Sequence, residues 1–372
     1  MSNLDRRKFI SSSATGAGLL GATVLSSSQA SAQNGVPQMI APKKRVLMKL
    51  GCQSPPSTDE HFAFLARYGI HHVNGYPTRV DKTLLYPTVD ELKALVDLGA
   101  RHGISVDMTE TVSLQSGGHT SAVMLGKSPE RDREIEGFQT TIKNCAAAGI
   151  PILKYNLTLL PVLRTGKVQG RGDATYQRWK LNDVLDAPLT AAGHVGTDES
   201  WERIGYFLSH VVPVAEEYKI RLALHPEDPG TPPGYRGVDR VLGTVDGLKK
   251  FVAMHENPYH GLNFCQGTVS ENLEDPATQI YDVIRYFGER KKIFNVHFRN
   301  IRGHRNDFVA EIFPDEGSVD FVKAVRAYRD VGYDGMLMPD HVPLGSPEAE
   351  LQNFAYAYGY IRGLMQFADE SI

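Results

Sequence analysis

The chain has 372 residues, of which 41% are apolar and 22% are charged, and its formal net charge is −3. This is the composition of a globular protein of enzyme size, and no basic stripe indicates a nucleic-acid partner. The three cysteines, Cys52, Cys145 and Cys265, are too few and too scattered for a disulfide framework.

The N-terminus carries an export signal. A twin-arginine pair, Arg6-Arg7, precedes an apolar Gly/Ala-rich stretch, and Ala30-Ser-Ala is typical of a cleavage site. We therefore expect a signal peptide over residues 1–32, a mature chain that starts at Gln33, and a periplasmic or secreted location. The alternative, an ordinary N-terminal helix, leaves the Ser-rich run 26–28 unexplained. The apolar stretch is too short and too weakly hydrophobic for a stable membrane anchor.

Beyond residue 44, short apolar runs alternate with longer amphipathic stretches, which is the pattern of a parallel sheet covered by helices. Eight such pairs predict a single α/β domain over residues 33–372, a (β/α)8 TIM barrel. The expected strands are 45–50, 71–75, 105–110, 152–156, 221–227, 261–266, 293–300 and 335–341. The expected helices are 59–68, 88–102, 130–148, 199–218, 245–254, 276–288, 318–331 and 348–367.

Residues at the expected helix ends agree with this division of the chain. Thr88 and Asp198 precede acidic first turns, and Gly103, Gly149 and Gly332 fall where helices should stop. Each glycine is followed within a few residues by an expected strand.

The longest interruption, at about residues 157–197, follows the fourth strand. Because active sites of such barrels lie at the C-terminal ends of the strands, this loop is expected to act as a lid or substrate wall. A solvated surface excursion is the alternative. The side chains that the loop would bring are Arg164, Arg171, Tyr176, Arg178 and Trp179.

The last four strands each end in a residue that can bind a metal ion: His225, Cys265, His297 and Asp340. In a closed barrel the ends of neighbouring strands surround one mouth, so these side chains can converge on one ion. Taken singly, the cysteine could be a buried apolar residue, either histidine a core imidazole, and the aspartate a loop cap. Together they predict a divalent-metal site.

The donor set does not by itself fix the metal. Two imidazoles and a thiolate favour zinc or iron, whereas the carboxylate also suits manganese, and zinc is the default on these grounds. Further polar residues lie at the same strand ends: Glu227, Asp228, Gln266, Arg299, Asn300 and His341.

These segments resemble the mannonate dehydratases, a family of xylose-isomerase-like barrels. The matching motifs are His225-Pro-Glu-Asp-Pro, Phe264-Cys-Gln-Gly, His297-Phe-Arg-Asn, Asp340-His-Val-Pro and, more loosely, Tyr155-Asn-Leu. The resemblance implies loss of water from D-mannonate, or a related small-molecule sugar acid, to give 2-keto-3-deoxy-D-gluconate. It also implies Mn²⁺ as the ion bound by the four residues, with Zn²⁺, Fe²⁺ and Co²⁺ as alternatives. A homo-oligomer is compatible with it.

The same resemblance suggests further roles. His341, next to Asp340, is expected to transfer a proton, with orientation of its neighbour as the alternative role, and Glu227 is a second candidate for acid–base catalysis. Arg299 is the candidate that grips the substrate carboxylate, with pairing to a nearby acid as its alternative role. Asn300, Asn156 and Arg171 complete the expected substrate-binding residues.

The sequence departs from the family pattern in two places. Leu50-Gly-Cys-Gln stands in place of an aromatic-rich segment, and Leu344-Gly-Ser-Pro-Glu in place of a Gly-rich stretch with a tyrosine. The nearby Tyr356, Tyr358 and Tyr360 have helical spacing, which indicates packing or a helix surface. A metal-dependent sugar isomerase or epimerase, and a periplasmic sugar-binding protein without turnover, therefore stand as alternative functions.

Overall fold

The computed structural model describes residues 44–53, 55–111 and 121–370, which all belong to one compact unit, Lys43–Ile372. The expected signal peptide at 1–32 lies outside the described residues, as does Gln33. Within the described part of the chain, no helix combines the length and apolar character needed to cross a membrane.

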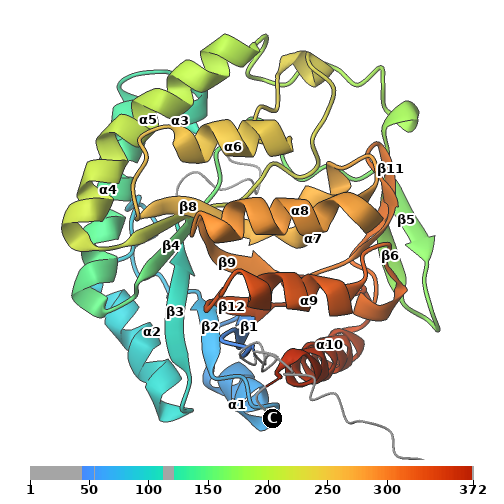
Figure 1. The fold of residues 1–372 in the computed structure, drawn as a ribbon. Coiled ribbons are helices and arrows are strands. Elements are labelled where there is room, and N and C mark those ends of the chain that lie inside the picture. Colours follow the sequence, from blue (N-terminus) through green and yellow to red (C-terminus); the bar gives the residue numbers. More distant parts are fainter. Residues whose placement is uncertain (1–43, 54, 112–120, 371–372) are drawn as a thin grey trace, which may run out of the picture. The chain divides into compact units, whose positions relative to one another are not determined.

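Eight parallel strands close into a barrel in the order β1-β12-β9-β8-β7-β4-β3-β2 (Figure 1). The predicted (β/α)8 fold is therefore confirmed. The strands are β1 (Lys49–Gln53), β2 (His72–Gly75), β3 (Ser105–Glu110), β4 (Ile152–Tyr155), β7 (Arg221–Leu224), β8 (His260–Cys265), β9 (Ile293–His297) and β12 (Met336–Met338).

The eight predicted helices are all present and lie around the barrel (Figure 1). They are α1 (Asp59–Arg67), α2 (Val89–Arg101), α4 (Glu130–Ala148), α5 (Thr197–Tyr218), α6 (Val245–Ala253), α8 (Pro276–Glu289), α9 (Phe321–Asp330) and α10 (Pro347–Ala368). Two short helices were not predicted, α3 (Ala122–Leu125) and α7 (Gln266–Glu271). Single 3-10 turns lie at Leu181–Asp183, Tyr235–Gly237 and Pro314–Glu316.

The helix ends follow local chemistry, with one correction. Thr88 caps α2 through a capping box with Glu91. Gly149 ends α4 with a φ of 79°, a left-handed conformation that costs glycine little. Asp198 is not a cap, because α5 begins one residue earlier, at Thr197. The aspartate lies in the first turn, where its negative charge suits the helix dipole.

The long loop after β4 contains a hairpin that the sequence analysis missed. Strands β5 (Gly166–Gln169) and β6 (Thr175–Lys180) join β10 (Ile301–His304) and β11 (Asp307–Ala310) in an antiparallel sheet of order β10-β11-β6-β5. Tyr176 and Trp179 are buried. The loop is therefore a packed substructure beside the barrel and not a solvated excursion (Figure 1).

Two apolar layers support the strands. Tyr155 on the outer face of β4 packs against Phe138 of α4 and Phe207 of α5. Inside the barrel lies a smaller cluster, which consists of Met108, Ile152, Ala223, Phe294, Met336 and Met338. Because side chains alternate along a strand, residues two positions beyond an interior residue also point inward. This rule directs polar side chains of several strands into the barrel mouth.

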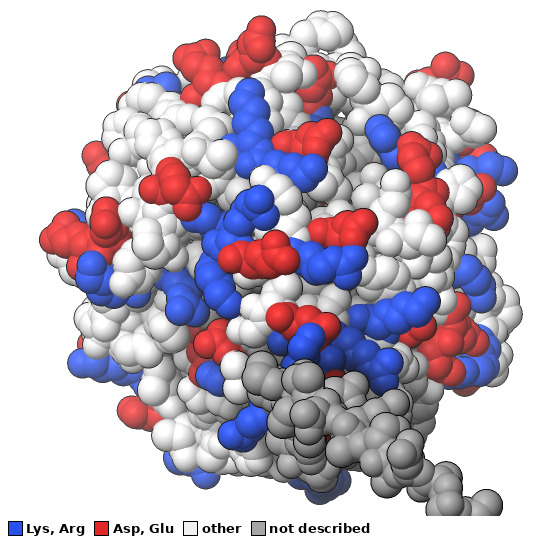
Figure 2. Space-filling view, viewed as in Figure 1, with Lys and Arg blue, Asp and Glu red and all other residues white. Residues whose placement is uncertain are grey.

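The surface carries charges of both signs. On the face shown in Figure 2, lysine and arginine side chains are interspersed with aspartate and glutamate.

Candidate active site

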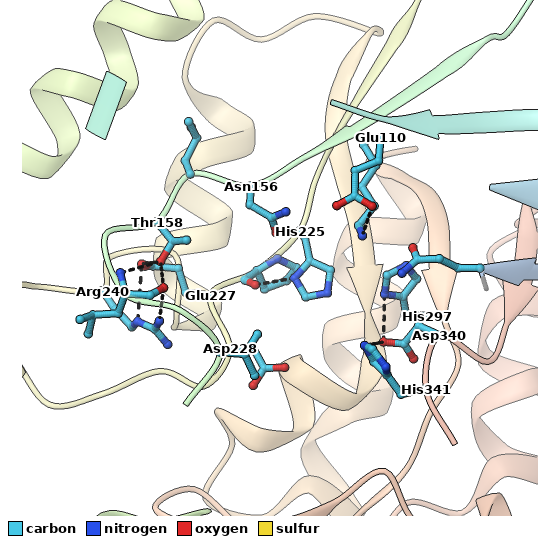
Figure 3. Close-up of a pocket in the computed structure, with 16 residues that line it drawn as sticks. Glu110, Asn156, Thr158, His225, Glu227, Asp228, Arg240, His297, Asp340 and His341 are labelled. Carbon is cyan, nitrogen blue, oxygen red and sulfur yellow. Dashed lines mark hydrogen bonds and ion pairs between the residues drawn. The ribbon is translucent and has the colours of Figure 1, made fainter. Parts of the chain in front are cut away.

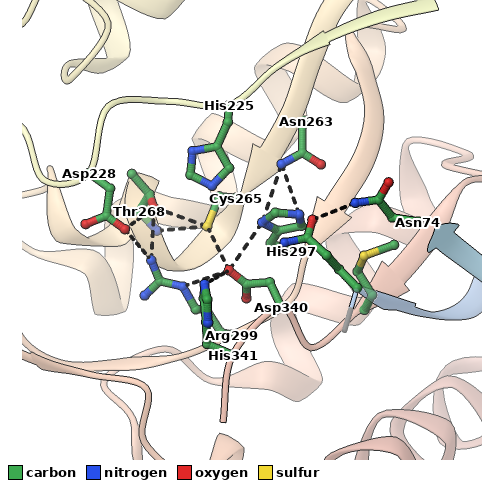
Figure 4. A network of polar contacts seen from close by, with 12 residues as sticks. Asn74, His225, Asp228, Asn263, Cys265, Thr268, His297, Arg299, Asp340 and His341 are labelled. Atoms are coloured by element: carbon green, nitrogen blue, oxygen red, sulfur yellow. Dashed lines mark hydrogen bonds and ion pairs between the residues drawn. The ribbon is translucent and has the colours of Figure 1, made fainter. Parts of the chain in front are cut away.

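The four residues predicted to bind a metal converge at the mouth of the barrel. One ligand atom from each of His225, Cys265, His297 and Asp340 lies within 4.8 Å of every other (Figure 4). Cys265 and His297 are paired neighbours on β8 and β9. His225 comes directly after β7, and Asp340 lies two residues beyond the end of β12. Cys265, His297 and Asp340 expose 0%, 1% and 5% of their surface. We refer to these four residues as the quartet.

The bonding of the quartet fits a cation. The Oδ1 atom of Asp340 is buried and has no hydrogen-bond partner among the described residues, which is costly for a carboxylate without a cation. The Nδ1 atom of His225 lies 2.6 Å from the carbonyl oxygen of Pro226. A carbonyl only accepts, so Nδ1 carries the hydrogen and Nε2 keeps a free lone pair for a metal.

Burial and nearby charges set the protonation states of His225 and Asp340. Burial, aided by the nearby positive charge of Lys154, lowers the pKa of His225 to about 4. Asp340 stays ionised, because His297 and Arg299 outweigh its burial and hold its pKa well below the usual range. A neutral imidazole at His225 and an ionised carboxylate at Asp340 are forms that bind divalent ions.

A second layer of hydrogen bonds orients the quartet. The backbone N–H of Thr268 donates to the sulfur of Cys265 at 3.4 Å, and its hydroxyl lies 3.2 Å from the same atom. Such donors stabilise a thiolate. The side-chain amide of Asn263 lies 3.1 Å from Nε2 of His297. Asn295 holds Asn263 in turn, at 2.6 Å.

Arg299 is placed as in the alternative considered for it, paired with nearby acids. All three guanidinium nitrogens are already paired, with Asp340 at 3.3 Å, Glu271 at 2.7 Å and Asp228 at 2.9 Å. The side chain is buried beneath the quartet and does not line the pocket. It therefore balances buried carboxylates and lies away from the pocket in which a substrate would bind.

Asn300 and Arg171 are also placed away from the pocket. The amide of Asn300 donates to the carbonyls of Pro314 and Val319, so the side chain shapes the chain after β9. Arg171 forms a bidentate pair with Asp315 and stacks over Phe313, which ties the β5–β6 hairpin to the segment after β11. Neither residue lines the pocket.

A pocket opens directly above the quartet (Figure 3). Thr158, Glu227 and Arg240 cluster at one end, and His297, Asp340 and His341 lie at the other. The lining residues are Gln53, Glu110, Lys154, Asn156, Leu157, Thr158, Leu160, Val162, His225, Pro226, Glu227, Asp228, Arg240, His297, Asp340 and His341. Of the predicted substrate-binding residues, Asn156 is the one that the structure places here.

The two predicted acid–base residues both line this pocket. Burial raises the pKa of Glu227 to about 7, although Arg240, the N–H of Leu242 and the hydroxyl of Thr158 act against this shift. The side chain of His341 is 56% exposed, and its Nε2 atom lies 3.8 Å from Asp340. A carboxyl group with a pKa near neutrality is suited to proton transfer.

Comparison with known proteins agrees with this site. The family model described as D-mannonate dehydratase (UxuA) matches residues 177–369, more than half of the chain. The chain belongs to the D-mannonate dehydratase family. Members of this family are hydro-lyases, and the matched segment contains the whole quartet.

Relatives and a solved structure extend this result. Mannonate dehydratase 1 of Halalkalibacterium halodurans is 30% identical over 277 residues, covering 65% of this chain and 73% of the relative. Mannonate dehydratase 2 of the same organism is 28% identical, covering 74% and 86%. The mannonate dehydratase of Streptococcus suis has the same fold, with a TM-score of 0.72 at 22% identity, covering 87% of this chain and 95% of that one.

The sequence analysis missed Gln53, Glu110 and Lys154, which line the pocket from the other half of the barrel. Glu110 and Lys154 each lie two positions beyond a residue of the interior cluster, Met108 and Ile152. The alternation of side chains along a strand, which brings polar groups into the mouth, is therefore the signal that could have found them.

No tyrosine of α10 replaces the one that the family pattern carries. Tyr358 is buried with its hydroxyl 2.9 Å from the sulfur of Cys52. Tyr356 packs on Phe313, and Tyr360 on Phe321. The three residues pack on and around the helix, as predicted, and none of them lines the pocket.

Replacing Cys265 with serine is expected to lower the affinity for a divalent ion by about 10-fold or more, because a hydroxyl is a much poorer ligand than a thiolate. Cys145→Ser is the matched control, since Cys145 is an equally buried thiol within α4. Metal content after dialysis, measured by elemental analysis, checks the prediction. Equal metal content in the two variants would remove Cys265 from the ligand set.

Proposed function

We propose that this protein dehydrates D-mannonate, or a closely related aldonate, to the 2-keto-3-deoxy acid with the help of a divalent metal ion. The observation that carries the proposal is the convergence of the quartet beneath a pocket that also holds Glu227 and His341. The family of the chain supplies the reaction class.

The reaction removes two groups from adjacent carbons. A base takes the proton from C2, the hydroxyl leaves C3 with a proton supplied by an acid, and the resulting enol rearranges to the 2-keto acid. The C2 proton is weakly acidic and hydroxide is a poor leaving group, so both bonds need help. An ion held by the quartet would supply positive charge where negative charge develops on the substrate carboxylate.

The positions of His341 and Glu227 suit the two proton transfers. They lie at opposite ends of the pocket, so a substrate between them can lose a proton at one side and a hydroxyl at the other (Figure 3). We assign His341 as the base, because its ring is exposed to the pocket and lies beside Asp340. Glu227 is the acid, because its raised pKa keeps a share of the carboxyl protonated near pH 7.

The pH dependence of turnover tests the role of Glu227. The active form is the protonated acid, so kcat is expected to fall as the pH rises through about 7. Glu227→Gln cannot donate a proton and should lower kcat by about 100-fold or more, with the descending limb lost from the profile. A Gln variant that keeps both the rate and the limb would contradict the assignment.

Manganese is the ion that we propose for the quartet. Two imidazoles and a thiolate also suit zinc and iron, but the carboxylate and the family resemblance favour Mn²⁺. Reloading metal-free protein with Mn²⁺, Zn²⁺, Fe²⁺ or Co²⁺ and comparing turnover decides among them. Higher turnover with another ion would overturn the choice of manganese.

The substrate is best identified with a panel of aldonic and uronic acids, incubated with the manganese-loaded protein and followed by mass spectrometry of the products. Loss of one water from D-mannonate supports the proposal. Isomerisation without water loss would instead show a sugar isomerase or epimerase. Binding without any product would show a binding protein.

We also propose export through the twin-arginine pathway, on the basis of Arg6-Arg7 and the apolar stretch that follows. Such export would allow the quartet to load its metal before the folded protein crosses the membrane. Cell fractionation tests the proposal: Arg6→Lys/Arg7→Lys should keep the protein in the cytoplasm. Unchanged localisation of this double variant would contradict it.

A further inference from the structure

Because Arg299 is buried against carboxylates and does not line the pocket, a different cationic side chain is the candidate to receive the substrate carboxylate. Among the described residues that line the pocket, Lys154 and Arg240 are the lysine and arginine side chains. The choice between them can be made from their existing contacts.

The two terminal nitrogens of Arg240 are already bonded to backbone carbonyls. Its Nη1 atom donates to the carbonyl of Pro229 at 2.5 Å, and its Nη2 atom donates to the carbonyls of Leu160 and Pro161 at 2.7 and 2.6 Å. Its Nε atom lies 3.8 Å from Glu227. This guanidinium holds together the loops after β4 and β7, and a substrate could reach it only by breaking those contacts.

Lys154 is placed differently. It lies on β4, two residues beyond the interior residue Ile152, so its side chain points into the barrel mouth. β4 pairs with β7, the strand that leads to His225. The ammonium therefore lies beside the quartet, on the half of the barrel that provides no metal ligand.

The ammonium of Lys154 has donors to spare. Its partner in the described structure is Glu110, 3.2 Å away on the neighbouring strand β3, and the side chains of the pair are 6% and 10% exposed. An ammonium carries three N–H donors, and one carboxylate does not use them all. Glu110 also accepts a hydrogen bond from the hydroxyl of Tyr76 at 3.2 Å, so its charge is shared.

We propose that Lys154 receives the carboxylate of the substrate and so makes this site select a sugar acid over the corresponding uncharged sugar. Glu110 is the positioning residue that holds the ammonium toward the pocket. Asn156, two residues further along the chain, faces the same pocket and is placed to bond hydroxyl groups. The inference rests on the proposed function, because it names the residue that reads the acid group of that substrate.

A lysine that serves only as half of a buried ion pair would also be costly to remove, so the test must separate recognition from packing. The readout is the ratio of two affinities, measured by calorimetry on the full chain: D-mannonate and its uncharged analogue D-mannonamide. A packing defect weakens both ligands alike, whereas loss of carboxylate recognition weakens the acid alone.

In Lys154→Met, the affinity for D-mannonate is expected to fall by about 10- to 100-fold, the effect of losing one charge-assisted hydrogen bond, while the affinity for the amide is unchanged. Lys154→Arg should keep most of the preference for the acid. Lys292→Met is the matched control, since Lys292 is also buried and ion-paired, to Glu256, in the pocket at the opposite end of the barrel. It should leave the ratio as in the wild type.

An unchanged acid-to-amide ratio in a folded Lys154→Met protein would overturn the assignment. If that variant fails to fold, Glu110→Gln decides the question. The glutamine oxygen can still accept from the ammonium and hold it in place, but the competing negative charge is gone, so the preference for the acid should rise. A constant ratio contradicts the role of Lys154. If the wild-type protein dehydrates D-mannonate and Lys154→Met binds D-mannonate as tightly as the wild type does, the role of Lys154 is contradicted but the proposed function stands. Wild-type protein that neither binds nor converts D-mannonate defeats the proposed function and this inference with it.

Discussion

Asp340→Asn is expected to lower kcat/KM for D-mannonate by about 1,000-fold or more and to remove bound metal. The substitution keeps the shape of the side chain but removes its charge. The orphaned Oδ1 atom of Asp340 and its contact with His297 at 3.2 Å place this carboxylate at the centre of the quartet. Steady-state kinetics and elemental analysis of the purified variant check both effects.

Asp107→Asn provides the control for this prediction. Asp107 is a partly buried aspartate on β3 that is bonded to His72 of β2 and Lys49 of β1, and it does not line the pocket. Its substitution should leave metal content and turnover within a few fold of the wild type. If Asp340→Asn retained its metal and its activity, the quartet would not be the catalytic centre.

Arg299→Met is expected to destabilise the fold by about 3–5 kcal/mol, because it leaves buried carboxylates without their cation. Arg299 contacts Asp340, Glu271 and Asp228, and the last two are also paired with Arg164. Even with these cations in place, burial raises the pKa of Glu271. Equilibrium unfolding in urea measures the loss.

Arg171→Met is the matched comparison for the loss of stability in Arg299→Met. Arg171 also forms a bidentate pair with an aspartate, Asp315, but 45% of its side chain is exposed, so its loss should cost less than about 1 kcal/mol. An Arg299→Met protein as stable as the wild type, with only a raised KM, would restore the original prediction that Arg299 grips the substrate.

The barrel could be predicted because its signal is local. Each strand and helix shows in the periodicity of a few residues, and eight alternations allow few other folds. The second sheet could not be predicted in this way. Strand β6 pairs with β11, more than a hundred residues further along the chain. The apolar pattern of neither strand indicates which other strand it pairs with.

The site was predicted in part for a similar reason. Strand ends in a closed barrel share one mouth, which was enough to bring His225, Cys265, His297 and Asp340 together. The same rule did not place Arg299 and Asn300 in the pocket, because β9 ends at His297 and both side chains are buried with partners of their own. A polar residue just after a strand can be placed near the barrel mouth from the sequence. Its function also depends on its burial and its hydrogen-bond partners, which the sequence does not show.

The most direct test of the account follows the fate of D-mannonate that carries deuterium at C2, with manganese-loaded protein and with Asp340→Asn. The account predicts a product that has lost one water together with the C2 deuterium, a slower reaction than with unlabelled substrate, and no product from the variant. Recovery of unchanged substrate, or of an epimer that has lost no water, would contradict a dehydration. Equal conversion by Asp340→Asn would contradict a metal-dependent reaction at this site.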